Sequence, residues 1–435
     1  MSARRLIATA VAVLALGAAA PAGAASWRTP TTLPGAGDVN SSVAVGTDGT
    51  AAIAYVAGGV RVAVRNAGGR WGTPVRVSQG SFNVTGPSVA VDGKGGVIVA
   101  WTQDGNPRGG GLVRGPLTIR TIIRARSGAW GTVHLIGTSS HFIEANAQVA
   151  ANAAGDAIIT WSGVRQLGGT RRTLAVQSSY RPATRPFGGA QTIREPETPN
   201  GISGGVVAID DRGTAYAAWT NDAGPVVRIA ARSRGASGSW GSQRTIGPAQ
   251  ASNPVIALTP AREAIVAWHD AGVDSEGNGL QTGPLMTASR LPSGALSAVT
   301  QVASTQTRDY ELAVAPSGEA MLTLGSRPTG SEDVTLFQVA VRPAGAAQFG
   351  PAAAVPGVLP GGALTYLADA TALYVWNTST AVLSVARPAG GAFGDQQQVA
   401  EPGLYPRVGA TGNTAVAVWS VASGERVRIA TADRR

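Results

Sequence analysis

The most regular feature of the sequence is a short apolar run that ends in an aromatic residue and recurs along the chain. Residues 88–102 read SVAVDGKGGVIVAWT, two apolar runs joined by a glycine-rich turn, which predicts a β-hairpin. Trp101 ends its second strand, and equivalent anchor residues end the other copies: Tyr55, Trp161, Trp219, Trp268, Leu324, Trp376 and Trp419. Neighbouring anchor residues lie 43 to 60 residues apart, the spacing of β-propeller blades. The runs are apolar on both strand faces, as expected of strands packed between two neighbouring sheets.

Each anchor residue is followed by a third apolar strand, and in seven copies by a glycine-rich turn and a fourth strand. Residues 60–78 are the clearest copy, with Trp71 opening the fourth strand, and later copies centre on Trp130, Phe187, Trp240, Leu296, Phe349 and Phe393. The last repeat ends before its fourth strand, whereas residues 26–33 have the same form as the stretch that begins at Trp71. We therefore expect an all-β, eight-bladed β-propeller in which an N-terminal strand completes the last blade. Seven blades would result if the copy around Leu324 or Ala372 did not form a full sheet.

The first 25 residues have the pattern of a signal peptide. Arg4 and Arg5 precede the apolar run 6–20, and Ala22-Gly23-Ala24 resembles a cleavage site. We expect residues 1–25 to be removed and residues 26–435 to form one secreted or extracytoplasmic propeller domain, exported by the general secretory or the twin-arginine route. No later apolar stretch is long enough for a transmembrane segment. The chain has no cysteine, and a domain of this size can bury enough apolar surface to fold without disulfides.

The charge balance is basic, with 35 Lys and Arg against 25 Asp and Glu and a formal net charge of +10. A basic surface attracts polyanions, but the arginines are scattered at repeat positions, so we expect no nucleic-acid partner. An arginine is expected to end the third strand of every repeat: Arg65, Arg126, Arg181, Arg234, Arg290, Arg342, Arg387 and Arg434. We expect these guanidinium groups to lie over the aromatic ring of the fourth strand or to cap turns. A basic ring that binds polyanions is the alternative.

The expected strand order places candidate ligand-binding residues on one face. The turns between strands one and two, and between three and four, are short and share a face, whereas connections of varied length share the opposite face. Varied loops on a constant scaffold often carry binding sites. The ligand-binding candidates on this face are Asp104, Asn106, Arg108, Arg165, Arg171, His269, Asp270, Arg308, Asp309, Tyr310, Tyr405 and Arg407. This mixture of arginine, carboxylate, amide and aromatic groups suits a polar ligand such as a sugar, and an ordinary loop surface also contains it.

No motif identifies a catalytic residue, a metal site or a cofactor site. Asp274, Glu276 and Asn278 imitate the start of a calcium loop, but Leu285 stands where such a loop has a carboxylate, and we favour a solvated acidic loop. The three histidines are far apart and cysteine is absent, which argues against zinc. The sequence has no G-x-S-x-G elbow and no phosphate-binding glycine loop. We expect neither a metal nor a cofactor.

The turn before the fourth strand, RNAGGRWG or RPAGGAFG, resembles the Asp-box (BNR) region of sialidase-like propellers. The resemblance covers that turn alone, and the Ser-x-Asp hallmark is missing from every copy. The Arg-Ile-Pro motif of sialidases is absent near the first strand, and their Tyr–Glu pair and acidic Asp have no matching positions. The chain as a whole is similar to exported bacterial repeat proteins from GC-rich actinobacteria. The resemblance implies a propeller fold and leaves glycosidase chemistry without assigned residues.

Three functions fit these observations. We favour a secreted, monomeric, non-catalytic module that binds a polysaccharide or another cell-surface or envelope component. A sialidase-like glycoside hydrolase or lyase that acts from the face of varied loops is the first alternative, and a structural envelope protein is the second. Arginine and carboxylate side chains converging at the mouth of the central channel would favour the enzyme, whereas a heterogeneous face would favour binding.

Overall fold

The computed structural model describes residues 26–33, 41–79, 84–104, 117–139, 147–168, 171–194, 202–221, 226–232, 238–247, 251–270, 283–327, 336–421 and 427–433. Within these ranges the regular elements are all β-strands, as the apolar runs predict. None of the described segments forms a helix of the length and apolarity needed to cross a membrane. The strands form seven hydrogen-bonded sheets, most of them with four strands.

The first four sheets follow one another along the chain. The first contains β3 (Ser41–Val45), β4 (Ala51–Val56), β5 (Val60–Arg65) and β6 (Val75–Arg76). The second contains β7 (Val84–Val91), β8 (Val97–Asp104), β9 (Leu117–Arg124) and β10 (His134–Ser139). The third contains β11 (Gln148–Ala151), β12 (Ala157–Gly168), β13 (Arg171–Arg181) and β14 (Gln191–Arg194). The fourth contains β15 (Ile202–Ile209), β16 (Ala215–Asn221), β17 (Val226–Arg232) and β18 (Arg244–Thr245).

The remaining three sheets include one with seven strands and one that joins the two ends of the chain. The seven-stranded sheet contains β19 (Ala251–Leu258), β20 (Ala264–Asp270), β21 (Gly283–Arg290), β22 (Thr300–Val314), β23 (Ala320–Arg327), β24 (Leu336–Arg342) and β25 (Ala353–Ala354). The next contains β26 (Ala363–Tyr366), β27 (Ala372–Asn377), β28 (Val382–Arg387) and β29 (Gln397–Ala400). The last contains β30 (Gly403–Thr411), β31 (Thr414–Val421), β32 (Val427–Asp433), β1 (Ser26–Trp27) and β2 (Thr31–Thr32).

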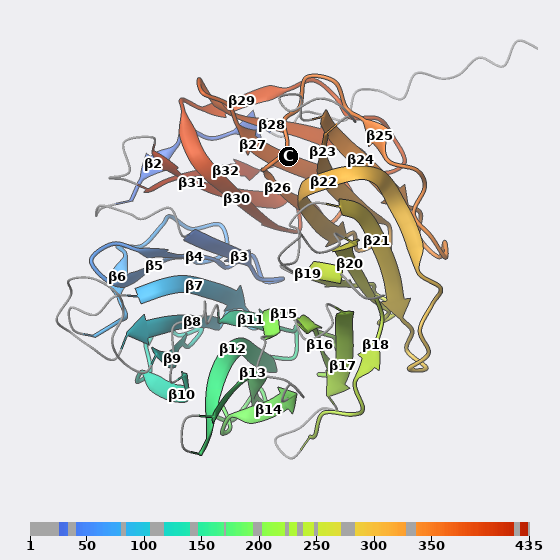
Figure 1. The fold of residues 1–435 in the computed structure, drawn as a ribbon. Coiled ribbons are helices and arrows are strands. Elements are labelled where there is room, and N and C mark those ends of the chain that lie inside the picture. The colour runs from blue at the N-terminus through green and yellow to red at the C-terminus, as the bar shows by residue number, and fades with distance from the viewer. Residues whose placement is uncertain are drawn as a thin grey trace, which may run out of the picture.

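The sheets are arranged around a central axis, with the first strand of each repeat innermost (Figure 1). The innermost strands contact one another in sequence order, and β30 contacts β3, so these contacts run around the whole ring. The long strand β22 pairs with β21 through its first half and with β23 through its second, which merges two repeats into one sheet. Radial, antiparallel sheets in this order are the architecture of a β-propeller.

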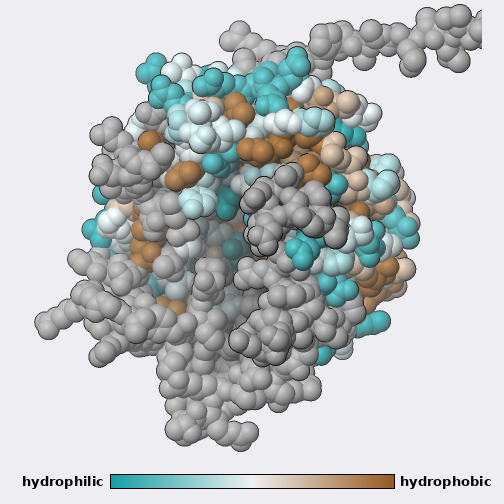
Figure 2. Space-filling view, turned by 45° about the horizontal axis from the view of Figure 1, so that its top comes forward, coloured by the Kyte–Doolittle hydropathy of each residue, from teal (hydrophilic) through white to brown (hydrophobic). Residues whose placement is uncertain are grey.

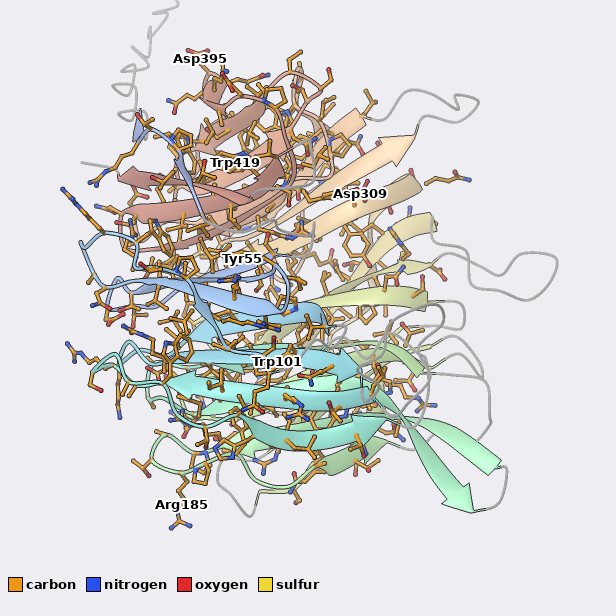
Figure 3. The ribbon with its side chains drawn as sticks, turned by 90° about the vertical axis from the view of Figure 1, so that its left-hand side faces the viewer. Tyr55, Trp101, Arg185, Asp309, Asp395 and Trp419 are labelled. Carbon is orange, nitrogen blue, oxygen red and sulfur yellow. The ribbon has the colours of Figure 1, made fainter. Side chains whose placement is uncertain are left out.

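The anchor residues are the centres of packing between neighbouring sheets. Each of the eight, including Tyr55, Trp101 and Trp419 in Figure 3, has an exposed fraction of 0%. Trp101 packs with Val62 of the first sheet and Val99 of its own. An aromatic ring on the second strand thus fills the space between two sheets, which explains why the sequence repeats it at blade spacing.

Glycines make room for several of these indole rings. A Cβ atom on Gly247 would lie 2.9 Å from Trp268 Cε2, and Trp268 is completely buried. We expect Gly247→Ala to lower the free energy of unfolding by about 1–3 kcal/mol, because the indole must shift in a close-packed interior. Urea denaturation would measure the change. Gly189→Ala is the matched control, since nothing lies within 4 Å of its added Cβ, and an equal loss there would contradict the steric explanation.

The N-terminal segment adds two short strands to the sheet of the last repeat. Trp27 pairs with Ala432, and Thr31 pairs with Ile429, both on β32. Trp27 Nε1 also donates a hydrogen bond of 2.8 Å to Ser384 Oγ in the preceding sheet. Leu33 is 3% exposed and packs in the cluster that contains Tyr55 and Val418. The pairing predicted from the form of residues 26–33 is therefore present.

The third strands of seven repeats end in an arginine. Arg124 and Arg232 end the third strands of the second and fourth sheets. The prediction that Arg126 and Arg234 end these strands was therefore wrong by two residues. Arg234 and Arg434 lie outside the described residues. The expected contact with the fourth-strand ring occurs at Arg65, whose guanidinium lies 5.6 Å from the centroid of Trp71.

Most of the other terminal arginines reach the preceding repeat. Arg232 lies 4.2 Å from the ring centroid of Tyr180, and Arg342 Nη2 lies 2.6 Å from Glu263 Oε2. Arg387 Nη1 lies 2.7 Å from Glu319 Oε1 in the same way. These contacts are consistent with a structural role for the repeated arginines.

Candidate functional site

Five of the innermost strands contain the same β-bulge, and it lies opposite the anchor residue. In β30, Leu404 pairs with Ser420 and Arg407 with Val418, so residues 405–406 oppose Trp419 alone. The same two-against-one pairing occurs in β7, β15, β19 and β22. The first bulge residue has a positive φ in four of them: Gly86 at 54°, Asn253 at 51°, Asp309 at 49° and Tyr405 at 53°. A bulge of this kind bends the strand and re-aims the next side chain.

The residues that follow the bulges of β7, β22 and β30 line one cavity of about 400 Å³. These residues are Ser88, Glu311 and Arg407, and we call their cavity the mouth cavity. Its other polar lining residues are Ser41, Ser42 and Gln148. The mouth cavity lies at the start of β3 and β11 and directly after the bulges of β7, β22 and β30. In Figure 3, Asp309 lies toward one side of the sheets, and Arg185, in the turn between β13 and β14, lies toward the other.

Serine hydroxyl groups connect adjacent strands at this cavity. Ser42 Oγ accepts a 3.2 Å hydrogen bond from the Val89 backbone N–H, and Ser88 Oγ accepts one of 3.1 Å from Val149. Each hydroxyl group keeps its own hydrogen for another acceptor. The Ser41 hydroxyl is buried and has no hydrogen-bond partner among the described residues. The cavity therefore offers hydroxyl groups that are fixed in place and able to donate.

Glu311 and Arg407 give the mouth cavity its charge. Burial raises the pKa of the Glu311 carboxyl group to about 7, and the positive charge of Arg407 opposes this rise. Within the described residues the two side chains form no ion pair, and the Arg407 guanidinium makes one long hydrogen bond of 3.4 Å, to its neighbour's carbonyl. A carboxyl group with a pKa near neutrality can act as an acid, a base or a hydrogen-bond donor. A guanidinium with this freedom can bind an anionic group.

Glu311 was not among the residues expected from the sequence, whereas Arg407 was. The signal that could have found it is the dipeptide before it. Gly86-Pro87, Asn253-Pro254 and Tyr405-Pro406 mark the bulge in three strands, and Asp309-Tyr310 occupies the same place before Glu311. Aligning the innermost strands on these dipeptides places Ser88, Glu311 and Arg407 at equivalent positions.

His269 and Tyr310 form a second cluster beside the mouth cavity. Their rings meet edge to face with centroids 4.5 Å apart, and the Tyr310 hydroxyl donates to the Asn253 carbonyl. His269 is 3% exposed, and burial lowers its pKa to about 4. Neither ring nitrogen has a hydrogen-bond partner in the described part of the chain. In this structure the His269 side chain thus belongs to the packing between sheets and not to the surface.

The other expected site residues are distributed over several repeats. Asp104 ends β8, Asp270 ends β20, and Arg308 and Asp309 lie at the bulge of β22. Arg165 and Arg171 lie in the β12–β13 hairpin, where Arg165 pairs with Thr173. Outside the described residues are Asn106, Arg108, Asp274, Glu276 and Asn278. The described residues contain no group of three potential metal ligands.

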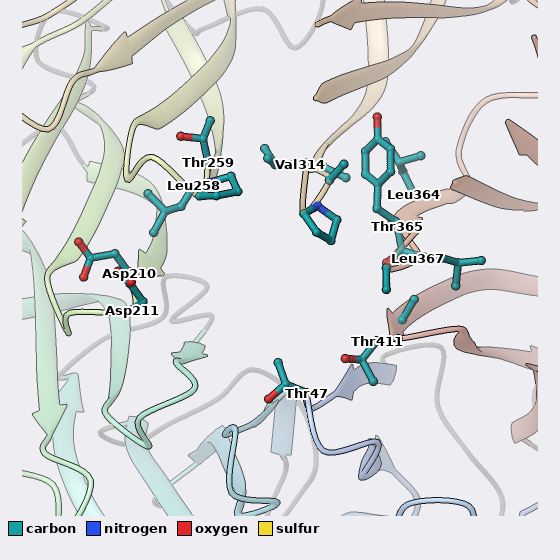
Figure 4. Close-up of a pocket in the computed structure, with 18 of the residues that line it drawn as sticks. Thr47, Asp210, Asp211, Leu258, Thr259, Val314, Leu364, Thr365, Leu367 and Thr411 are labelled. Atoms are coloured by element: carbon teal, nitrogen blue, oxygen red, sulfur yellow. The ribbon is translucent and has the colours of Figure 1, made fainter. Parts of the chain in front are cut away.

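A second cavity of about 810 Å³ lies at the opposite ends of the innermost strands (Figure 4). Its wall alternates apolar side chains such as Leu258 and Leu367 with the turn residues Asp210 and Asp211. The Asp210 carboxylate already accepts backbone N–H groups from Arg212 and Thr214, at 3.0 and 2.7 Å. We assign this carboxylate to capping its turn. Over the described surface seen in Figure 2, hydrophilic and hydrophobic residues are interspersed.

Comparisons with known proteins show the fold. No family model matches the sequence, and no curated protein matches it. An ulvan lyase from a new polysaccharide lyase family superposes with a TM-score of 0.53 and 12% identity, over 92% of this chain and 95% of that one. A second structure of that lyase is bound to -[GlcA(1-4)Rha3S]-. The Dos1 propeller superposes with a TM-score of 0.54 and 9% identity, over 94% and 95% of the two chains. At these identities the likeness establishes an all-β propeller and nothing about activity.

Proposed function

We propose that this protein is an exported β-propeller that binds a polysaccharide or another envelope component at the mouth cavity without transforming it. The observation that carries the proposal is the convergence of Glu311 and Arg407 with fixed serine hydroxyl groups in one cavity between the innermost strands. A few polar groups that converge in a cavity on a rigid scaffold are typical of small-ligand sites. The propeller fold shared with a polysaccharide lyase is compatible with a glycan ligand.

We further propose eight blades formed by one domain over residues 26–435, after removal of residues 1–25 as a signal peptide. Eight innermost strands in mutual contact support the count, with β22 serving two blades. Pairing of β1 and β2 with β32 supports closure by the N-terminal segment. The apolar run 6–20 after two arginines supports export.

A glycan array probed with the chain from residue 26 onward tests the binding proposal. Arg407→Gln is expected to weaken binding by about 10- to 100-fold, the value of one charge-assisted hydrogen bond. Arg185→Gln is the control, because Arg185 lies in a turn on the other side of the sheets (Figure 3). Equal losses in the two variants would indicate non-specific attraction to a basic surface and would contradict a site at the mouth cavity. Absence of any glycan binding would favour the structural envelope role.

A polysaccharide lyase or glycoside hydrolase is the second candidate, and the raised pKa of Glu311 favours it. Glycoside hydrolysis uses two carboxyl groups, whereas Glu311 supplies the sole carboxyl group among the described lining residues of the mouth cavity. This difference argues against a glycoside hydrolase, whereas β-elimination by a lyase needs no pair of carboxyl groups and is tested by the product assay. Release of new reducing ends or unsaturated products from a bound glycan, abolished by Glu311→Gln, would replace the binding proposal with the enzymatic one.

A further inference from the structure

Tyr405 occupies a backbone conformation that tyrosine rarely adopts. Its φ of 53° lies in the left-handed region, where a bulky side chain is an outlier. The equivalent bulge positions hold Gly86, Asn253 and Asp309, which are the residue types that tolerate this conformation. A tyrosine here is therefore unfavourable for the local backbone. Residues held in such conformations cluster at functional sites, where another requirement outweighs the strain.

Nothing within the described structure explains the tyrosine by packing. Its side chain is 53% exposed, the second most exposed of the large apolar and aromatic residues in the described part of the chain. It has no hydrogen bond, ring contact or cation–aromatic contact with the described residues. Tyr55 and Tyr374, by contrast, are buried between sheets. Tyr405 thus presents an exposed ring two residues before Arg407 in the same strand.

Tyr405 stands two residues before Arg407, a lining residue of the mouth cavity, and does not itself line the cavity. Tyr405 offers a flat, rigid apolar face. Arg407 adds a guanidinium without a carboxylate partner in the described structure, and Ser41, Ser42 and Ser88 add hydroxyl groups. A pyranose ring has the complementary character, with an apolar C–H face and polar groups along its edge. Burial raises the pKa of the Glu311 carboxyl group to about 7, so that at pH 6 the group is able to donate a hydrogen bond and does not repel an anion.

We propose that Tyr405 is an aromatic platform next to the mouth cavity, on which a pyranose ring of an anionic polysaccharide stacks while its anionic substituent binds Arg407. This inference rests on the proposed function and names the class of polysaccharide. Carboxylate and sulfate groups both match a guanidinium, so the shared chemistry is an anionic sugar. Tyr405 fixes which ring face is bound, and Arg407 fixes the charge.

Calorimetric titration at pH 6 of the chain from residue 26 onward, with three polymers, tests the inference. The probes are polygalacturonate, dextran sulfate and uncharged dextran, which separate carboxylate, sulfate and neutral ligands. We expect wild-type binding to at least one anionic polymer and at least tenfold weaker binding to dextran. Tyr405→Asn, which keeps a residue suited to the bulge as in Asn253, is expected to weaken binding about 5- to 50-fold. Tyr405→Phe, which keeps the ring, is expected to stay within about threefold of wild type.

Thermal unfolding of the same variants distinguishes a role of Tyr405 in ligand binding from a role in stabilising the fold. Tyr405→Asn and Tyr405→Gly are expected to unfold at the same or a higher temperature than wild type, because they relieve the left-handed strain. Weaker binding together with undiminished stability would support the platform. Unchanged affinity in Tyr405→Asn, with binding lost in Arg407→Gln, would overturn the role of Tyr405 and leave the proposed function standing. Equal binding of dextran would overturn the anionic class. No binding of any of the three polymers by wild type would overturn this inference, whereas the proposed function stands or falls with the glycan array.

Discussion

A chain that begins at residue 34 is expected to be less stable by about 3–6 kcal/mol than one that begins at residue 26. The deletion removes β1 and β2 from β32 and leaves that strand as a free edge of its sheet. It also removes Leu33, which is 3% exposed, from the cluster of Tyr55 and Val418, and Trp27 from its contact with Ser384. Fully burying a large apolar side chain contributes about 1.5–3 kcal/mol. Leu33 is buried and Trp27 is partly buried, and the pairing of β1 and β2 with β32 adds to their contribution.

Denaturant unfolding of the two chains, followed by tryptophan fluorescence, measures this effect. Trp27→Ala and Leu33→Ala in the longer chain retain the backbone pairing and remove only the apolar side chains. Together they are expected to account for most of the loss, because side-chain burial is its main source. Thr29→Ala, at an exposed position of the same segment, is the control and is expected to change stability by less than about 0.5 kcal/mol. A deletion that leaves the unfolding midpoint unchanged would contradict closure by the N-terminal segment.

Glu311→Gln and His269→Phe are expected to change the pH dependence of stability in opposite directions. The folded state keeps His269 neutral down to a pKa of about 4, whereas an unfolded chain protonates it near 6.5. Stability from this residue is therefore lost as pH falls from 6.5 toward 4. The folded state keeps Glu311 protonated up to a pKa of about 7, whereas an unfolded chain releases the proton near 4.5. Stability from this residue is therefore lost as pH rises from 4.5 toward 7.

The two contributions oppose each other across almost the same pH range, and each is worth at most about 3 kcal/mol. In Glu311→Gln the histidine remains, so stability relative to wild type is expected to fall on acidification. In His269→Phe the carboxyl group remains, and stability relative to wild type is expected to rise on acidification. Urea denaturation between pH 4.5 and 7.5 measures both slopes, and the double variant should restore the wild-type slope. Two single variants that run parallel to wild type would contradict the burial of both groups.

The positions of the anchor residues could be predicted from the sequence because they depend on local information. An apolar strand, its glycine-rich turn and its closing aromatic residue are contiguous, and their recurrence reveals the repeat. The form of residues 26–33 likewise matched the fourth strand that the last repeat lacks. The assignment of Arg126, in place of Arg124, failed because hairpin register decides which residue ends a strand, and glycine-rich turns do not specify register by composition alone.

The candidate site was only half predictable. Arg407 and Tyr405 could be selected as polar and aromatic residues of the face of long connections. Glu311 was not selected, because only an alignment of the innermost strands on their bulge dipeptides distinguishes it from a solvated carboxylate. His269 was expected at the surface because it follows an anchor residue, whereas Tyr310 of the next repeat packs against its ring.

The sequence by itself determined the repeat, the strand that carries each anchor residue and the segment that joins the two ends of the chain. The reason is that these features follow from short-range hydrophobic periodicity, which any copy displays on its own. Only the tertiary structure decided that residues 41, 88, 148, 311 and 407 share one cavity. These residues are close together only because the sheets are arranged in a circle around the central axis. The raised pKa of Glu311 follows from its burial among those sheets. Trp101 and its equivalents relate the sequence repeat to the cavity, since five of these anchor residues lie opposite the bulges that bend the innermost strands.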